Sequence, residues 1–146
     1  MSSEKLRDES WLFFLLSGEH PTLPHAELRA ILEAEGFCFR GEESLAQLIR
    51  LKCDPACAKR VASRAAMTRV CCLELFSCEA EEKAILDHAV GVPFAQYIRP
   101  GQSFRVRIKR VRGYGKELDV LGLEKELGGV VYEAVKGLKV DLRSPE

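Results

Sequence analysis

The sequence lacks the long apolar runs and leader pattern of membrane or secreted proteins. No run approaches the roughly 18 apolar residues that a membrane-spanning helix needs, and the longest near the start is Trp11–Leu16. The polar stretch Met1–Ser10 has no basic region ahead of an apolar one, so it is not a typical signal peptide. We therefore expect no membrane association and a cytoplasmic location.

The sequence also lacks a metal-ligand spacing. Six cysteines are present, but no CxxC pair occurs, and the three histidines do not complete a zinc-finger pattern. Cys53 and Cys57 come closest, yet Asp54-Pro55 between them is typical of a capped helix start. Cys71 and Cys72 lie in an apolar run, where a free cysteine packs as a small hydrophobe. We predict reduced structural thiols and no metal site.

Net charge is absent overall, but the positive charge is gathered in one place. Lysine and arginine total 22, as do aspartate and glutamate. Residues 99–116 hold seven basic residues and no acidic one, which leaves a net charge of −7 on the remaining 128 residues. A neutral protein that concentrates its cations in this way commonly binds an anionic partner, and phosphate is the leading candidate.

The pattern inside this segment predicts a strand. Three apolar residues, Phe104, Val106 and Ile108, alternate with Arg105, Arg107 and Lys109. In a strand the three cations would lie on one face about 7 Å apart, close to the separation of successive phosphates along a nucleic-acid strand. The alternative is a solvated edge strand whose cations only prevent unwanted pairing. Past Lys109 the alternation breaks, and Arg110 and Arg112 lead into the Gly113-Tyr114-Gly115 loop.

The first half of the chain predicts the order strand, helix, strand, strand, helix, strand, which is ferredoxin-like. Trp11–Ser17 is an apolar run suited to a central strand, and Thr22 precedes a helix that ends at Gly36. Two short strands, 37–40 and 44–52, are expected around a hairpin at Gly41–Glu43. Asp54 caps a second helix before a strand over 69–77. The packed face of that helix is expected to comprise Ala58, Val61, Ala62 and Ala65.

The second half predicts a separate α/β unit. A helix is expected from Glu79 to Gly91, a helical turn within 92–98, and then the basic strand. Apolar residues three or four apart predict a long helix over 120–134, and a last strand follows at 138–142. Gly128-Gly129 inside that helix costs about 1 kcal/mol per residue relative to alanine, so we expect a close packing contact there.

No catalytic constellation emerges from these patterns. Ser17, Glu19 and His20 are neighbours in sequence only, and a hydrolase needs such groups to converge beside an oxyanion hole. Gly113-Tyr114-Gly115 follows the basic strand but lacks the third glycine of a nucleotide-binding loop. We expect structural uses for these residues and no catalytic residue in this chain.

Four stretches resemble known proteins. Ser103–Arg110, Leu123–Gly129 and Lys139–Pro145, in this order, resemble the core pattern of a THUMP domain. The opening Leu15–Leu28 resembles the N-terminus of archaeal THUMP-class tRNA guanine-N2 methyltransferases, which modify the guanosine at position ten. The resemblance implies an α+β chain, with a ferredoxin-like domain over 1–77 and an α/β THUMP domain over 78–146. The THUMP pattern could begin near 55–60, and a terminal strand could lie beyond the sequence.

The resemblance implies that the chain binds tRNA at its acceptor stem and 3′ end. It assigns this role to Arg105, Arg107, Lys109, Arg110 and Arg112. Charge and loop position add Lys116 and Tyr114, and Tyr114 could either stack on an unpaired base or fold back on the sheet. Methyl transfer would belong to an S-adenosylmethionine-dependent domain, in the same or a partner chain, whose motifs are absent here.

Two alternatives to this function remain open on the sequence. The same pair of domains occurs in tRNA 4-thiouridine synthetases, so the resemblance extends to a second kind of tRNA modification. Ferredoxin-like domains also bind ligands or dimerise through their sheets, and the acidic remainder of the chain would suit a scaffolding or dimerisation module.

Overall fold

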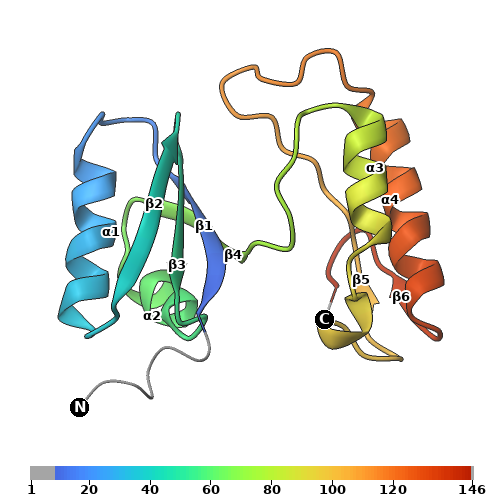
Figure 1. Cartoon of the computed structure of the whole chain (residues 1–146), viewed down its shortest axis with the longest axis horizontal. Helices are drawn as coiled ribbons and strands as arrows, with labels where there is room; N and C mark the ends of the chain where they lie inside the picture. The colour runs from blue at the N-terminus through green and yellow to red at the C-terminus, as the bar shows by residue number, and fades with distance from the viewer. Residues whose placement is uncertain (1–8, 146) are drawn as a thin grey trace. The chain divides into compact units, whose positions relative to one another are not determined.

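The structure, a computed structural model, describes residues 9–145. Most of the Met1–Ser10 stretch that bears on targeting lies outside this range. The chain divides into two compact units, Met1–Leu75 and Phe76–Glu146, and each is described by itself (Figure 1).

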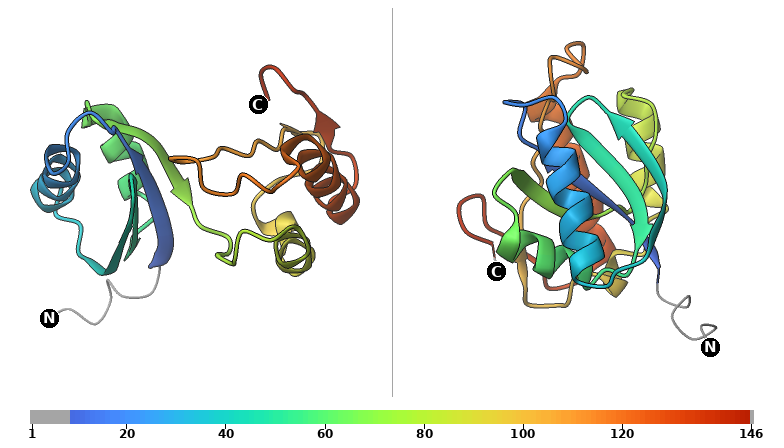
Figure 2. Two further views of the ribbon diagram at one scale, coloured as in Figure 1. Left: turned by 90° about the horizontal axis from the view of Figure 1, so that it is seen from above. Right: turned by 90° about the vertical axis from the view of Figure 1, so that its left-hand side faces the viewer.

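The first unit has the βαββαβ order of a ferredoxin-like domain, as the sequence predicts. Its elements are β1 (Ser10–Leu16), α1 (Leu23–Ala34), β2 (Phe39–Leu45), β3 (Leu48–Cys53), α2 (Cys57–Arg64) and β4 (Thr68–Leu73). The strands form an antiparallel sheet in the order β2-β3-β1-β4. Both helices lie on one face of that sheet (Figure 2).

Burial explains this arrangement. Leu12, Phe14 and Leu16 alternate along β1 and enter a core with Leu28 and Leu32 of α1. Ile49, Leu51 and Cys53 of β3 alternate in the same way, and Cys57 and Val61 complete the core from α2. The packed face of α2 therefore differs from the sequence prediction: Ala62 is exposed, and Cys57 is buried in its place.

The predicted hairpin at Gly41–Glu43 is wrong. β2 continues to Leu45, and the chain reverses at Ala46-Gln47, where Ala46 has φ of 51°. The register shifts between Arg40 and Glu43, so Gly41 (φ 66°) lies in a bulge of β2. A Cβ at Gly41 would lie 3.1 Å from the Trp11 ring, so the glycine admits the indole rather than ending the strand.

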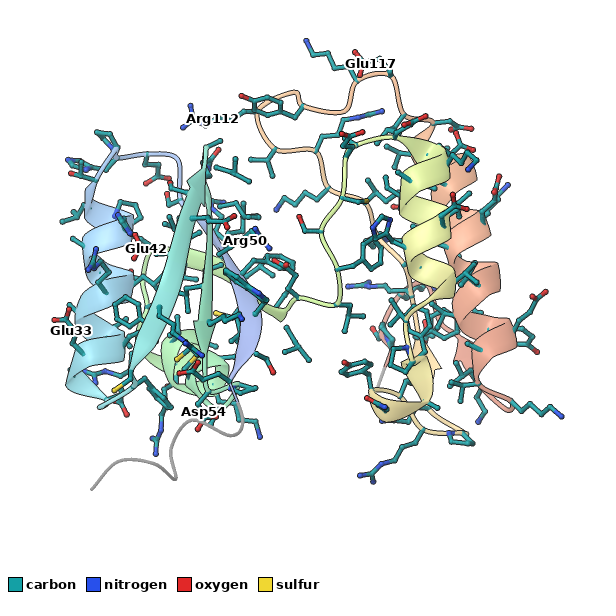
Figure 3. The ribbon with its side chains drawn as sticks, viewed as in Figure 1. Glu33, Glu42, Arg50, Asp54, Arg112 and Glu117 are labelled. Atoms are coloured by element: carbon teal, nitrogen blue, oxygen red, sulfur yellow. The ribbon has the colours of Figure 1, made fainter. Side chains whose placement is uncertain are left out.

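Trp11 also anchors the cations of β3 on the sheet face opposite the helices. The Arg50 guanidinium lies 4.7 Å from the Trp11 ring centroid, and the Lys52 ammonium lies 5.3 Å from it. Arg50 donates two hydrogen bonds of 2.6 Å to the Glu74 carboxylate and also binds Glu43. The hydrogen bond to Glu74 raises the pKa of Arg50 further above its usual range. Figure 3 labels Arg50.

The second unit is α/β. Its elements are α3 (Glu82–Val90), the 3-10 turn η1 (Phe94–Gln96), β5 (Ser103–Phe104), α4 (Val120–Ala134) and β6 (Lys139–Val140). β5 and β6 pair in parallel, which is possible because α4 provides the crossover between them. Phe104, Val135 and Leu138 form a small core, against which Phe94, Ile98, Val106 and Val131 pack.

The strand predicted over Phe104–Lys109 is much shorter in the structure. Only Ser103 and Phe104 pair with β6, in register with Lys139 and Val140. The predicted last strand over 138–142 is likewise limited to Lys139–Val140. The alternation of side chains predicts which residues turn inward. Strand pairing also needs a neighbouring strand to hydrogen-bond with, and the alternation does not predict one.

The start of α1 depends on His20. The Nδ1 atom of His20 accepts hydrogen bonds from the backbone N–H of Thr22 (3.3 Å) and Leu23 (3.0 Å). Thr22 occupies the N-cap position, but its side chain makes no capping bond. The imidazole therefore satisfies N–H groups that the first turn of the helix leaves without partners.

We predict that His20→Ala lowers the free energy of unfolding of the first unit by about 1 kcal/mol, the usual cost of removing a cap. His20→Asn should retain most of this stability, because asparagine Oδ1 occupies the position of histidine Nδ1 and accepts the same hydrogen bonds. Denaturant unfolding followed by circular dichroism measures both. Equal losses in the two variants would contradict a capping role.

Candidate nucleic-acid interface

The basic segment, residues 99–116, keeps its two-sided character beyond Phe104, where its pairing with β6 ends. Phe104 is buried, and Val106 and Ile108 are half-buried. Arg105, Arg107 and Lys109, at the alternate positions, are exposed. Three cations on consecutive odd positions therefore share the solvent side of the segment.

Arg105 and Arg107 bind the backbone of the segment that follows β6. Arg105 donates to the carbonyl oxygen of Arg143 at 2.9 Å, and Arg107 donates to that of Leu142 at 3.0 Å. The Asp141 carboxylate accepts from the N–H groups of Arg143 and Ser144, which orders this turn. The same two hydrogen bonds lower the pKa of Asp141.

Arg107 and Ile108 also meet a carboxylate from α4. Glu124 accepts a 2.8 Å hydrogen bond from the Ile108 N–H, and its other oxygen lies 3.4 Å from the Arg107 guanidinium. The Glu124 side chain is only 14% exposed. Sequence reasoning does not single out Glu124, because a lone glutamate on an amphipathic helix gives no signal of its distant partner.

Arg110 binds within its own loop. Its guanidinium donates to the carbonyl oxygens of Gly115 (3.0 Å) and Leu118 (2.6 Å). These two bonds close the loop that runs from Val111 to Leu118. Arg110 therefore orders the loop that presents the remaining candidates.

That loop presents Arg112, Tyr114 and Lys116. Positive φ angles at Arg112 (51°), Gly113 (76°) and Gly115 (71°) turn the chain sharply. Tyr114 is 72% exposed, so in this structure it does not fold back on the sheet. Figure 3 labels Arg112 and Glu117 on the loop, where Glu117 brings a negative charge directly after Lys116.

Charge compensation distinguishes several arginines of the first unit from Arg105 and Arg110 of the basic segment. In the first unit, arginines pair with carboxylates: Arg29 with Glu42, Arg60 and Arg64 with Glu35, and Arg69 with Glu19. These pairs account for two of the three cations on α2, the helix that carries a second cluster of basic residues. Arg105 and Arg110 instead donate to neutral carbonyl oxygens, which orient a guanidinium without cancelling its charge.

An apolar groove adjoins the basic segment. It has a volume of about 840 Å³, and its lining includes Phe104, Val106, Leu121, Tyr132, Val140 and Leu142. Gly128 and Gly129 form part of the wall, and a Cβ at either glycine would meet nothing within 4 Å. The close packing contact expected at this pair is therefore wrong, because the glycines face open space.

The other candidates serve structural roles. Ser17 accepts a hydrogen bond from the Glu19 N–H, and His20 caps α1. Burial raises the pKa of the Cys71 and Cys72 thiols above the ordinary value. Within residues 9–145, no three His, Cys, Asp or Glu side chains gather as a metal-binding group. No helix of the described part of the chain is long and apolar enough to cross a membrane.

Comparison with known proteins agrees with this architecture. Residues 79–146 match the family described as the THUMP domain. A tRNA (guanine(10)-N2)-dimethyltransferase of Methanothermobacter thermautotrophicus is 33% identical over 134 residues, covering 92% of this chain. This chain spans only 38% of that relative's length.

A solved structure, that of PH1313 from Pyrococcus horikoshii, shares the fold. The TM-score is 0.59 at 17% identity, and the match covers 92% of this chain and 48% of the other. Residues 79–146 are therefore similar to a THUMP domain. The chain as a whole resembles part of that tRNA (guanine(10)-N2)-dimethyltransferase.

The open glycine pair leads to a stability prediction. Gly128→Ala should raise the free energy of unfolding by up to about 1 kcal/mol, because alanine favours the helix and its methyl group meets no neighbour. Gly122→Ala in the same helix is the control: its Cβ would clash with the Asp119 carboxylate that caps α4, so it should destabilise. Thermal unfolding measures both, and a destabilised Gly128→Ala would contradict the open groove.

Proposed function

We propose that this chain binds tRNA as the recognition region of a tRNA-modifying enzyme, with the THUMP domain contacting the acceptor stem and 3′ end. The support for tRNA is the methyltransferase relative, with which this chain aligns over most of its length. The support for the surface is the basic segment, whose exposed side carries Arg105, Arg107 and Lys109.

The observation that carries the proposal is the net positive charge of this side. The chain is neutral overall, yet the basic segment contains no acidic residue. Arg105 is held by a backbone carbonyl, and Lys109 is exposed. An ordered, positively charged surface of this kind attracts the phosphates of a nucleic-acid strand, and guanidinium groups suit them because their planar fork donates two parallel hydrogen bonds.

The loop extends this surface. Arg112 and Lys116 add charge beyond the three aligned cations, and the exposed Tyr114 ring offers a face on which an unpaired base could stack. Arg110 acts mainly by closing the loop through Gly115 and Leu118. The proposed RNA-binding set is thus Arg105, Arg107, Lys109, Arg110, Arg112, Tyr114 and Lys116.

Guanine-N2 methylation is the proposed chemistry of the complete enzyme. The relative's name carries this activity, and this chain spans 38% of the relative's length. The methyl-transfer step and the S-adenosylmethionine cofactor would belong to a catalytic domain, in the same or a partner chain. A tRNA 4-thiouridine synthetase and a scaffolding module are the alternatives, and the named activity of the relative favours methylation over both.

The test is tRNA binding by this chain across a salt series, with Lys109→Gln/Lys116→Gln beside the unmodified protein. Lysines are chosen because Arg105, Arg107 and Arg110 also hold the protein's own backbone. We expect weaker binding, and a log–log salt dependence shallower by about 0.7–0.9 for each phosphate that the variant no longer neutralises.

The matched control is Lys59→Gln/Lys136→Gln, which removes the same charge from exposed positions outside the segment. The control should leave the salt slope unchanged. An equal weakening in both double variants would place the contact elsewhere or make it unspecific. If the unmodified chain fails to bind even at low salt, scaffolding becomes the better account.

A further inference from the structure

An acidic residue, Glu124, touches the proposed RNA-binding segment. It lies near the start of α4, and its side chain is mostly buried against residues 106–108. Its two carboxylate oxygens have different partners: one accepts the 2.8 Å bond from the Ile108 N–H, and the other lies 3.4 Å from the Arg107 guanidinium. A carboxylate beside a phosphate-binding surface opposes anion binding, so its presence calls for a compensating role.

The bond to Ile108 supplies that role. Strand pairing with β6 ends at Phe104, so the ladder does not hold residues 105–110. An unpaired extended segment samples many conformations, and fixing each residue on binding costs conformational entropy. The Glu124–Ile108 bond fixes the segment midway between Arg107 and Lys109, which keeps the two side chains on the same side before any RNA arrives.

The contact with Arg107 has the opposite effect. At 3.4 Å it is longer than the bond to Ile108, and Arg107 also donates to the carbonyl oxygens of Leu142 and Val106. Half of the Arg107 side chain is exposed. A phosphate can therefore replace the Glu124 oxygen as the partner of Arg107 while the bond to Ile108 stays intact.

We propose that Glu124 is a positioning residue with two separable effects on RNA binding. Through Ile108 it orders the basic segment and strengthens binding, whereas through its negative charge on Arg107 it weakens binding. The proposal rests on the RNA-binding function proposed above. The Glu124 carboxylate limits the affinity of the surface for anions, since it competes with phosphate for Arg107. Only RNA that places a phosphate at Arg107 displaces this contact.

Two substitutions separate the effects. Glu124→Gln keeps an oxygen that can accept the Ile108 N–H but removes the charge. The tRNA affinity should therefore rise about two- to fivefold, a modest gain because the Arg107 partner of the lost ion pair is half exposed to water. The slope of its log–log salt dependence should stay close to that of the unmodified chain, because Arg107 contacts a phosphate in both. Glu124→Ala removes both contacts and should bind tRNA about tenfold more weakly than Glu124→Gln, as expected when a hydrogen bond to a buried acceptor is removed.

The control is Glu126→Gln, an exposed position two residues along α4 that changes the net charge by the same amount. It should leave the affinity within about twofold of the unmodified chain, because positions two apart on a helix do not share a face and an exposed charge is screened by water and salt. If Glu126→Gln strengthens binding as much as Glu124→Gln does, the effect is one of overall charge. If Glu124→Ala binds as tightly as Glu124→Gln, the bond to Ile108 does not position the segment. Either result overturns the proposal.

Amide hydrogen exchange at Ile108 without RNA tests the positioning independently of function. The Ile108 N–H should exchange slowly in the unmodified chain and in Glu124→Gln, and at least about tenfold faster in Glu124→Ala, since the bond that protects it is gone. Fast exchange in all three would overturn the positioning role. If exchange behaves as expected but no variant binds tRNA, the proposed function fails while the structural role of Glu124 stands. Thermal melting of Glu124→Ala shows whether the variant still folds.

Discussion

The burial of Phe104 and the half-burial of Val106 and Ile108 determine the character of the basic segment. Once these three side chains turn inward, the residues between them have only the solvent side available. Hydrophobic burial is not directional, so it can impose this alternation where no strand partner exists. Carbonyl oxygens from 142–143 and the Glu124 carboxylate then hold the backbone and guanidinium groups in place. Apolar packing thus decides which side of the segment the cations occupy, and the hydrogen bonds fix the positions of their backbone and guanidinium groups.

Charge is compensated differently in the first unit and at Arg105 and Arg110 of the basic segment. Arginines of the first unit are paired with carboxylates on neighbouring elements, as Arg50 is with Glu43 and Glu74. Such pairs add structure without leaving a net field. In the basic segment, Arg105 and Arg110 are ordered by neutral groups, so order and positive potential coexist. A surface that must hold a shape and attract an anion needs both.

Sequence reasoning worked where a signal was local and failed where it depended on a distant neighbour. The βαββαβ order and the helix over 120–134 follow from side-chain periodicity, and the structure confirms them. The predicted hairpin is misplaced because Ala46-Gln47, where the chain reverses, contains none of the usual turn residues. Gly41 is a usual turn residue, but it lies in a bulge against Trp11. The groove beside Gly128-Gly129 and the bond from Glu124 to Ile108 depend on tertiary placement, which periodicity does not encode. The assignment of Arg105, Arg107 and the loop residues to RNA binding stays a prediction.

The carbonyl contacts of Arg105 and Arg107 have a consequence for sequence variation. Every amino acid supplies a main-chain carbonyl, so substitutions at 142 and 143 leave the acceptors in place, whereas those at 105 and 107 remove the donors. Amino-acid substitutions should therefore be tolerated at the acceptor positions 142 and 143 and restricted at the donor positions 105 and 107. The sequence at 142–143 can therefore diverge among related proteins while the charged surface formed by Arg105 and Arg107 stays the same.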